Sequence, residues 1–192
     1  IELNGSRIDD ESYLLGKTVH EPVKSSTKKR NSLRAKLKLN NKKVIVNGGG
    51  AWDWTATVEF LESLIAYYKK NPSSSIVFIQ CGIRQESNND HQKSYDGIIK
   101  LKKKNPTIFG KYGKIRVLEW NEASNLLPEL LHACDYGFGC SKVTVEAFQA
   151  HRVRNSEYLS YGLPVIMNEF DVMSDYLSQG GAIKINNKLN FL

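Results

Sequence analysis

Residues 44–68 read VIVNGGGAWDWTATVEFLESLIAYY, and this stretch decides the fold. It begins with a short β-branched run at 44–46, which favours a buried strand, and continues into three glycines at 48–50. Apolar residues then recur at helical spacing through 55–70. A strand that ends in a glycine turn and leads into an amphipathic helix is the first unit of an α/β fold.

The same alternation continues to the end of the chain, and every expected strand is a short continuous apolar run. Strands with this pattern are buried on both faces, as in a parallel sheet covered by helices. We therefore expect a doubly wound, Rossmann-like parallel sheet, with ligands bound at the carboxyl ends of its strands. The expected strands are 44–46, 76–79, 115–118, 136–139, 164–167 and 182–185, and the expected helices are 55–70, 92–104, 123–134, 153–161 and 171–178, with 140–151 ambiguous.

Length and composition agree with a globular domain. The chain has 192 residues, of which 41% are apolar and 14 are glycine, so wholesale disorder and collagen-like repeats are excluded. No run approaches the roughly 20 apolar residues of a membrane span. The sequence begins at Ile1 without a leader and ends at Leu192 without a polar tail, from which we expect a piece of a longer protein.

Charge divides the chain at residue 43. The net charge is +7, of which residues 1–43 supply +6 and residues 44–192 supply +1. We interpret 1–43 as a linker or N-terminal arm that ends in a short helix near 33–39, and 44–192 as the folded domain. The near-neutral domain argues against nucleic-acid binding. A second basic cluster at 93–116 is either a solvated face or a peripheral membrane contact.

The cysteines Cys81, Cys134 and Cys140 form neither a CxxC pair nor a zinc-ligand spacing. Their apolar surroundings in the sequence predict reduced core residues, as in a cytosolic protein.

The glycine loop at 48–54 lies where a strand meets a helix, and a helix start offers free N–H groups to a phosphate. The dinucleotide pattern GxGxxG fails, because Asp53 stands at its third glycine position. Two interpretations stay open: a ligand loop, or a tight turn in which Asp53 caps the helix. The large rings of Trp52 and Trp54 favour contact with something flat.

A second candidate loop, Val117–Asn121, follows the third expected strand. Its ring, Trp120, and nearby backbone groups could hold a nucleobase. The alternative is an ordinary strand end followed by a helix cap at Asn121 or Ser124.

A third region, residues 151–166, reads HRVRNSEYLSYGLPVI. Arg152 and Arg154 lie where a helix begins, and two guanidiniums beside a positive helix end repel each other unless an anion is bound. Glu157 follows one turn later, where a carboxylate could accept both hydroxyls of a ribose. The alternative is a surface i, i+3 ion pair. Arg84, after the second strand, is a weaker phosphate candidate by the same logic.

Residues 157–166, EYLSYGLPVI, resemble the E-A-x-A-x-G-x-P-V-I signature of GT-B glycosyltransferases of the family 4 type. The glycine–tryptophan turn and the Arg-x-Arg before the signature resemble a bacterial subgroup that acts in surface polysaccharide synthesis. The resemblance covers roughly 33–185, which in these enzymes is the C-terminal, donor-binding half.

The resemblance implies a role for each candidate residue. The sequence departs from the family pattern in two ways. Gln149 stands where the family usually has its first Glu. The glycine loop lacks the Arg and Lys that family members often have, so Arg152 and Arg154 are expected to contact the phosphates instead. The implied contacts are Gly49, Gly50, Arg152, Val153 and Arg154 for the donor diphosphate, Glu157 for the ribose, Val117, Glu119, Trp120 and Asn121 for the base, and Trp52, Asp53, Trp54, Arg84 and Gln149 near the sugar.

The implied reaction moves a sugar from a nucleoside diphosphate to the hydroxyl of a glycan or lipid-linked glycan. It implies that neither a metal nor a cofactor is needed, and that the general base lies in an N-terminal half. The isolated fragment is then expected to be inactive. The expected location is the cytoplasm, including the inner face of the membrane. Two alternatives remain: a GT-B nucleotide-sugar epimerase, and a basic nucleic-acid or membrane-binding module.

Overall fold

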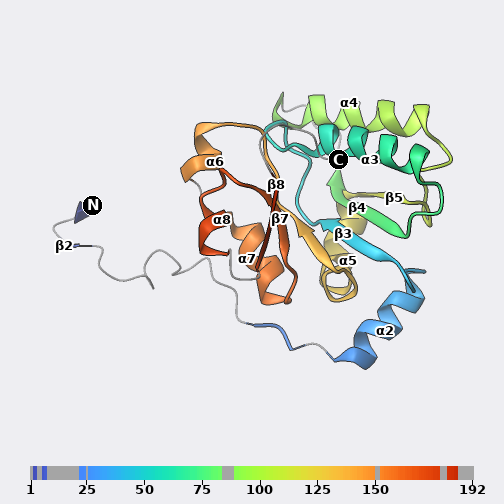
Figure 1. Cartoon of the computed structure of the whole chain (residues 1–192), viewed down its shortest axis with the longest axis horizontal. Helices are drawn as coiled ribbons and strands as arrows, with labels where there is room; N and C mark the ends of the chain where they lie inside the picture. The colour runs from blue at the N-terminus through green and yellow to red at the C-terminus, as the bar shows by residue number, and fades with distance from the viewer. Residues whose placement is uncertain are drawn as a thin grey trace.

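A six-stranded parallel sheet forms the centre of the molecule (Figure 1). The computed structural model describes residues 2–3, 6–7, 22–24, 26–83, 89–149, 152–177 and 181–185. The strand order β5-β4-β3-β6-β7-β8 confirms the doubly wound, Rossmann-like fold that the sequence predicts. The strands are β3 (Lys43–Asn47), β4 (Ile76–Ile83), β5 (Ile115–Glu119), β6 (Tyr136–Phe138), β7 (Val165–Asn168) and β8 (Ala182–Ile185).

Helices cover both faces of the sheet, as the buried pattern of its strands requires. Figure 1 shows α3 and α4 together on one side, whereas α5 lies on the other side, next to α2. The helices are α2 (Thr27–Lys36), α3 (Thr57–Lys70), α4 (Asn89–Lys104), α5 (Trp120–Ala133), α6 (Val145–Gln149), α7 (Val153–Ser160) and α8 (Met173–Tyr176).

Helix starts differ from the sequence-based expectation. Helix α5 begins at Trp120, three residues early, and Glu119 holds its N-cap position without a side-chain cap. Helix α3 is preceded by Ala56 and not by Asp53, so the Asp53 cap, one of the two interpretations left open for the glycine loop, does not form. The ambiguous stretch 140–151 contains the short helix α6.

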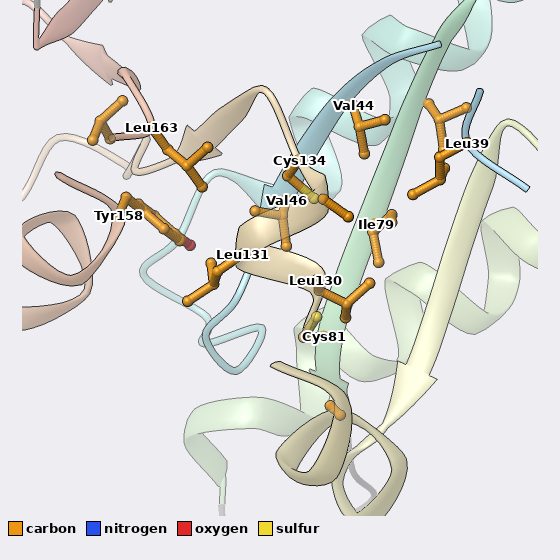
Figure 2. Packing of buried hydrophobic residues seen from close by; sticks show 14 of the residues in the cluster. Leu39, Val44, Val46, Ile79, Cys81, Leu130, Leu131, Cys134, Tyr158 and Leu163 are labelled. Carbon is orange, nitrogen blue, oxygen red and sulfur yellow. The ribbon is translucent and has the colours of Figure 1, made fainter. Parts of the chain in front are cut away.

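Two apolar clusters form the core, one on each face of the sheet. Alternate strand residues supply them: Val44 and Val46 face one cluster, and Ile45 faces the other. Figure 2 shows the first cluster, in which Tyr158 of α7 packs close to Leu131 of α5. Tyr158 is fully buried, and a Cβ at Gly137 would clash with its ring, so this crossing requires glycine.

Helix α2 packs on the domain, although its residues fall within the predicted linker. The Arg30 and Arg34 guanidiniums donate to the carboxylate of Asp135 at 2.7 and 3.2 Å. Leu33 and Leu39 are buried in the core beside α5. The helix also starts earlier than the expected 33–39. Near the N-terminus, the two-residue strands β1 (Glu2–Leu3) and β2 (Ser6–Arg7) pair antiparallel.

The three cysteines are free and buried, which confirms their prediction as reduced core residues. Burial raises the pKa of the Cys81 thiol to about 12 and also raises the pKa values of Cys134 and Cys140. None of the helices in the described ranges combines the length and apolar character that a membrane span needs.

Candidate functional site

The chain reverses its direction of travel across the sheet between β3 and β6. In open α/β sheets, ligands bind in the crevice outside the carboxyl ends of the strands at such a switch point. The glycine loop follows β3, and helix α7 brings its Tyr158 hydroxyl to that loop. The first and third sequence candidates therefore meet at one place.

A buried amide network fixes the glycine loop from below. The Asn47 side chain donates to Gln80 at 2.9 Å, and the Gln80 amide donates to the Gly49 carbonyl at 3.1 Å. The Gly49 N–H in turn donates to the Asn47 side-chain oxygen at 3.3 Å. Both amides are at least 95% buried, so the network orders the loop before any ligand arrives.

Tyr158 joins the glycine loop to α7. Its hydroxyl accepts a hydrogen bond from the Gly48 N–H at 2.8 Å, and burial raises its pKa. Tyr158 therefore stays neutral, and its hydrogen bond connects the glycine loop to α7. By contrast, the N–H groups of Gly50 and Ala51 donate to no acceptor among the residues that the structure describes. Helix α3 begins only at Thr57, so these are loop N–H groups and not the helix-start donors that the sequence predicts; N–H groups in turns can also bind an anion.

Arg154 is the cation that reaches the glycine loop. A Cβ placed at Gly49 would lie 3.8 Å from its Nε atom. The same guanidinium pairs with the Glu157 carboxylate, one turn later on α7. The i, i+3 pair weighed from the sequence is thus present, and it lies beside the loop.

Arg152 lies in a different environment. Its side chain is only 9% exposed, with Nε 3.7 Å from the Asp171 carboxylate and Nη1 donating to the Gly139 carbonyl at 3.2 Å. The guanidinium also lies 4.9 Å from the centre of the Trp54 ring. Its Nε and Nη2 atoms are buried and donate no hydrogen bond within the described residues, so Arg152 is enclosed by protein groups whereas Arg154 remains accessible.

The rings of the two loop tryptophans, Trp52 and Trp54, are nearly parallel, and their centres are 6.5 Å apart. Trp52 also contacts the His91 ring of α4 at 3.6 Å. The Asp53 carboxylate accepts a hydrogen bond from the Ser94 N–H of α4 at 2.8 Å. These contacts tie the far side of the loop to α4, and Asp53 has a structural partner in place of the predicted cap.

The predicted base residues begin beside the glycine loop. A Cβ at Gly82 would lie 3.1 Å from the Trp120 ring and 3.8 Å from the Cα of Gly50, and Gly82 has a φ of +67°. Glycine at this position therefore lets the exposed Trp120 ring lie next to the loop. Within the same segment, Val117 is half-buried in β5, and Glu119 and Asn121 are exposed.

Three further candidates are less closely tied to the loop. Val153 is exposed at the first position of α7, and Gln149 is exposed at the end of α6. Arg84 falls outside the described residues.

Sequence reasoning missed three residues that shape the site: Asn47, Gln80 and Tyr158. A signal for the first two existed, because each is a polar residue at or near the end of a buried apolar run. Tyr158 had a signal too, since it stands where the resembled signature has alanine.

The arrangement can bind an extended anion. It combines a cation at Arg154, loop N–H groups that donate to no acceptor among the described residues, a carboxylate at Glu157 and an exposed aromatic face at Trp120. A group of three or more His, Cys, Asp or Glu side chains suited to a metal ion does not occur within the described ranges.

No family model matches the sequence. No curated protein matches it either.

Solved structures with a similar fold are glycosyltransferases. One is α,α-trehalose 6-phosphate synthase from Burkholderia multivorans, with a TM-score of 0.64 and 15% identity over 84% of this chain and 35% of that chain. Another is Anabaena HepE in complex with UDP and glucose, with a TM-score of 0.60 and 18% identity over 84% of this chain and 39% of that one.

A third is the UDP-forming trehalose-phosphate synthase from Burkholderia xenovorans in complex with glucose-6-phosphate, with a TM-score of 0.59 and 14% identity over 86% of this chain and 37% of that chain. The chain thus spans less than half the length of these neighbours. The likeness supports the GT-B fold, and it does not support the family 4 type in particular.

Proposed function

We propose that this chain is the donor-binding part of a glycosyltransferase and holds a nucleoside diphosphate sugar at the switch point between β3 and β6. The observation that carries the proposal is the position of Arg154, whose guanidinium lies against Gly49 at the carboxyl end of β3. A cation over a glycine loop with unused N–H groups suits a diphosphate, which needs both charge and close backbone approach.

Glu157 is the proposed ribose contact. Its carboxylate is one quarter exposed and already pairs with Arg154. The ion pair leaves room for a ribose, because a carboxylate has about four acceptor positions. Arg154 and Glu157 would then bind neighbouring groups of one nucleotide, the diphosphate and the sugar ring attached to it.

Trp120 is the proposed contact of the base, and Trp52 is a second aromatic neighbour of Gly50. The Trp120 ring adjoins Gly50 through Gly82, within reach of a nucleotide whose phosphates lie on the loop. Its exposed ring could stack on a base face. The Trp52 indole nitrogen lies 3.4 Å from a Cβ position at Gly50, close to where the transferred sugar would begin.

The reaction proposed is displacement of a nucleoside diphosphate by an acceptor hydroxyl. The residues of this chain would orient the donor and neutralise the negative charge that develops on the leaving diphosphate. The acceptor, a glycan or lipid-linked glycan of bacterial surface polysaccharide synthesis, and the general base would come from outside this part of the fold. HepE, captured with UDP and glucose, supports this class of donor.

A thermal-shift panel of UDP, GDP, dTDP and ADP tests the proposal. One of the four at 100 times its dissociation constant should stabilise the chain by about 2.7 kcal/mol. The matched nucleoside and inorganic phosphate serve as controls and should stabilise it far less. No stabilisation by any of the four would contradict the proposal.

A second measurement separates transfer from epimerisation. The full-length protein should consume its nucleotide sugar only when an acceptor is present. Interconversion of nucleotide sugars without an acceptor would favour the epimerase alternative.

A further inference from the structure

A pocket lies beside the edge strand β5, away from the glycine loop. Its volume is about 470 Å³, within the range of small-molecule sites. Its lining comes from α5, from β5 and the turn that precedes it, and from the ends of α2 and α4. Helices α2 and α5 pack against each other on one side of the sheet (Figure 1). Leu118, Leu126 and Leu130 form much of its wall, so an apolar group could be buried there.

Positive charge collects around this apolar wall. Lys36, Lys102, Lys111 and Arg116 line the pocket, against the single carboxylate of Glu122. Lys36 is already paired with a carboxylate elsewhere on the surface. The other three cations have no carboxylate partner in the parts of the chain that the structure describes.

Arg116 is the buried member of the group and is only 6% exposed. Its guanidinium donates to three neutral carbonyls, those of Leu37 at 2.6 Å, Lys38 at 3.2 Å and Gly113 at 3.4 Å. Carbonyls orient a guanidinium but leave its charge uncompensated. A buried charge without an ionic partner is costly, and a bound anion would offset that cost.

Tyr112 marks the mouth of the pocket and is 53% exposed. Three cations surround its ring: Lys38 at 4.1 Å, Lys111 at 5.8 Å and Arg116 at 5.9 Å from the ring centre. Cation–π contacts of this kind are weak at exposed positions, and they do not remove the repulsion among three like charges.

We propose that this pocket binds a phosphorylated amphiphile, with its phosphate at Lys102 and Lys111 and its apolar part against the leucines of α5. The apolar wall accounts for the tail, and the uncompensated cations account for the anionic head. A sugar or a free base would leave the wall unused, and a neutral lipid would leave the cations unused. Of the residues that the resemblance implies for the donor, only Val117 lines this pocket, and neither the glycine loop nor Arg154, Glu157 or Trp120 does, so the pocket would take a second ligand.

Isothermal titration of octyl phosphate into the complete chain, below its micelle concentration, tests the proposal. We expect saturable binding at least tenfold tighter than that of butyl phosphate, because each buried methylene adds to the apolar contact. Octyl glucoside and inorganic phosphate should each bind at least tenfold more weakly than octyl phosphate. Equal binding of the glucoside, or no saturable binding, would overturn the proposal.

Matched lysine variants localise the site. Lys102→Gln combined with Lys111→Gln should weaken octyl phosphate binding at least tenfold. Lys103→Gln combined with Lys104→Gln removes the same charge from exposed positions outside the pocket and should change binding less than twofold. An equal loss in both double variants would overturn the proposal, because it would show general charge attraction.

Vesicle binding by the same variants distinguishes two sources of the ligand, a membrane lipid and a free phosphorylated amphiphile. Vesicles of phosphatidylcholine with phosphatidic acid should bind with the same dependence on Lys102 and Lys111 if the amphiphile is a membrane lipid. If octyl phosphate binds and these vesicles do not, the ligand is a free phosphorylated amphiphile. Both results support the pocket, and they separate its two possible sources.

Discussion

Arginines pair with carboxylates at both ends of the parallel strands. We call these the amino edge and the carboxyl edge of the sheet. The two arginine clusters differ in how many guanidinium donors are already used within the protein. At the amino edge, Asp135 accepts from Arg30, Arg34 and the Val44 N–H. Arg34 also donates to the Ala133, Leu39 and Lys42 carbonyls. At the carboxyl edge, Arg154 has one carboxylate, Glu157, and lies beside the glycine loop.

The difference separates a structural cluster from a binding cluster made of the same residue types. A guanidinium whose donors are fully used holds helices and strands together and has nothing left for a ligand. A guanidinium with spare donors next to unused backbone N–H groups is prepared for an anion. Arg152 is two residues from Arg154 and resembles the first kind in its burial against Asp171, Gly139 and Trp54, but its Nε and Nη2 atoms donate no hydrogen bond within the described residues.

The largest effect is expected at the amino edge. Asp135→Ala removes the acceptor shared by Arg30 and Arg34 and leaves Arg34, at 11% side-chain exposure, without its carboxylate. The free energy of unfolding, measured by urea titration, should fall by about 3 kcal/mol. Lys36→Ala, which breaks the exposed pair with Glu129, is the matched control and should cost less than about 1 kcal/mol. Similar losses in the two variants would contradict the account.

The next effect tests the assignment of Arg152. Arg152→Ala removes a nearly buried guanidinium from Asp171, Gly139 and Trp54 and should lower the free energy of unfolding by about 2 kcal/mol. Arg154→Ala should cost less than about 0.5 kcal/mol, because its side chain is 37% exposed. Urea titration of both variants side by side measures the contrast, and a larger loss for Arg154→Ala would reverse the assignment.

Binding should show the opposite order. Arg154→Ala should weaken nucleoside diphosphate binding at least tenfold, since a charge-assisted contact contributes about 1.5–3 kcal/mol. Binding of the matching nucleoside should change far less, because it lacks the phosphates. Calorimetric titration of both ligands is the measurement, and an equal loss for both would place Arg154 away from the diphosphate.

The remaining binding effect concerns the ribose. Glu157→Gln keeps the shape of the side chain but exchanges one acceptor for a donor and removes the charge, at a cost of about 1–3 kcal/mol. The wild type should prefer a ribonucleotide over its 2′-deoxy form, and the variant should lose most of that preference. A variant that keeps the full preference would leave Glu157 as the ion-pair partner of Arg154 and nothing more.

The fold was predictable because its signals are local. Each buried strand is a continuous apolar run, and the alternation with amphipathic helices specifies a parallel sheet. The helix start at Trp120 was not predictable, because no side-chain cap marks it. The contacts of α2 depend on Asp135, about 100 residues away in sequence, and no local pattern reports such a pairing.

The candidate site was predictable in part. The sequence singled out Gly49, Arg154 and Glu157, which the structure brings together, because glycine turns and charged helix starts have local signatures. It could not distinguish Arg152 from Arg154. That distinction depends on Asp171, which reaches Arg152 only through the tertiary packing of α7 against the strand end of β7.

The central claim is that an anion binds at the carboxyl edge between β3 and β6. The most direct measurement is the change in backbone amide NMR signals of the complete chain as the most stabilising nucleoside diphosphate of the thermal-shift panel is added. The account predicts the largest changes at Gly48–Gly50 and at Arg154–Glu157, with little change at Arg34 and Asp135. Changes centred on the cluster around Asp135, or no changes at the glycine loop under saturation with that nucleotide, would contradict it.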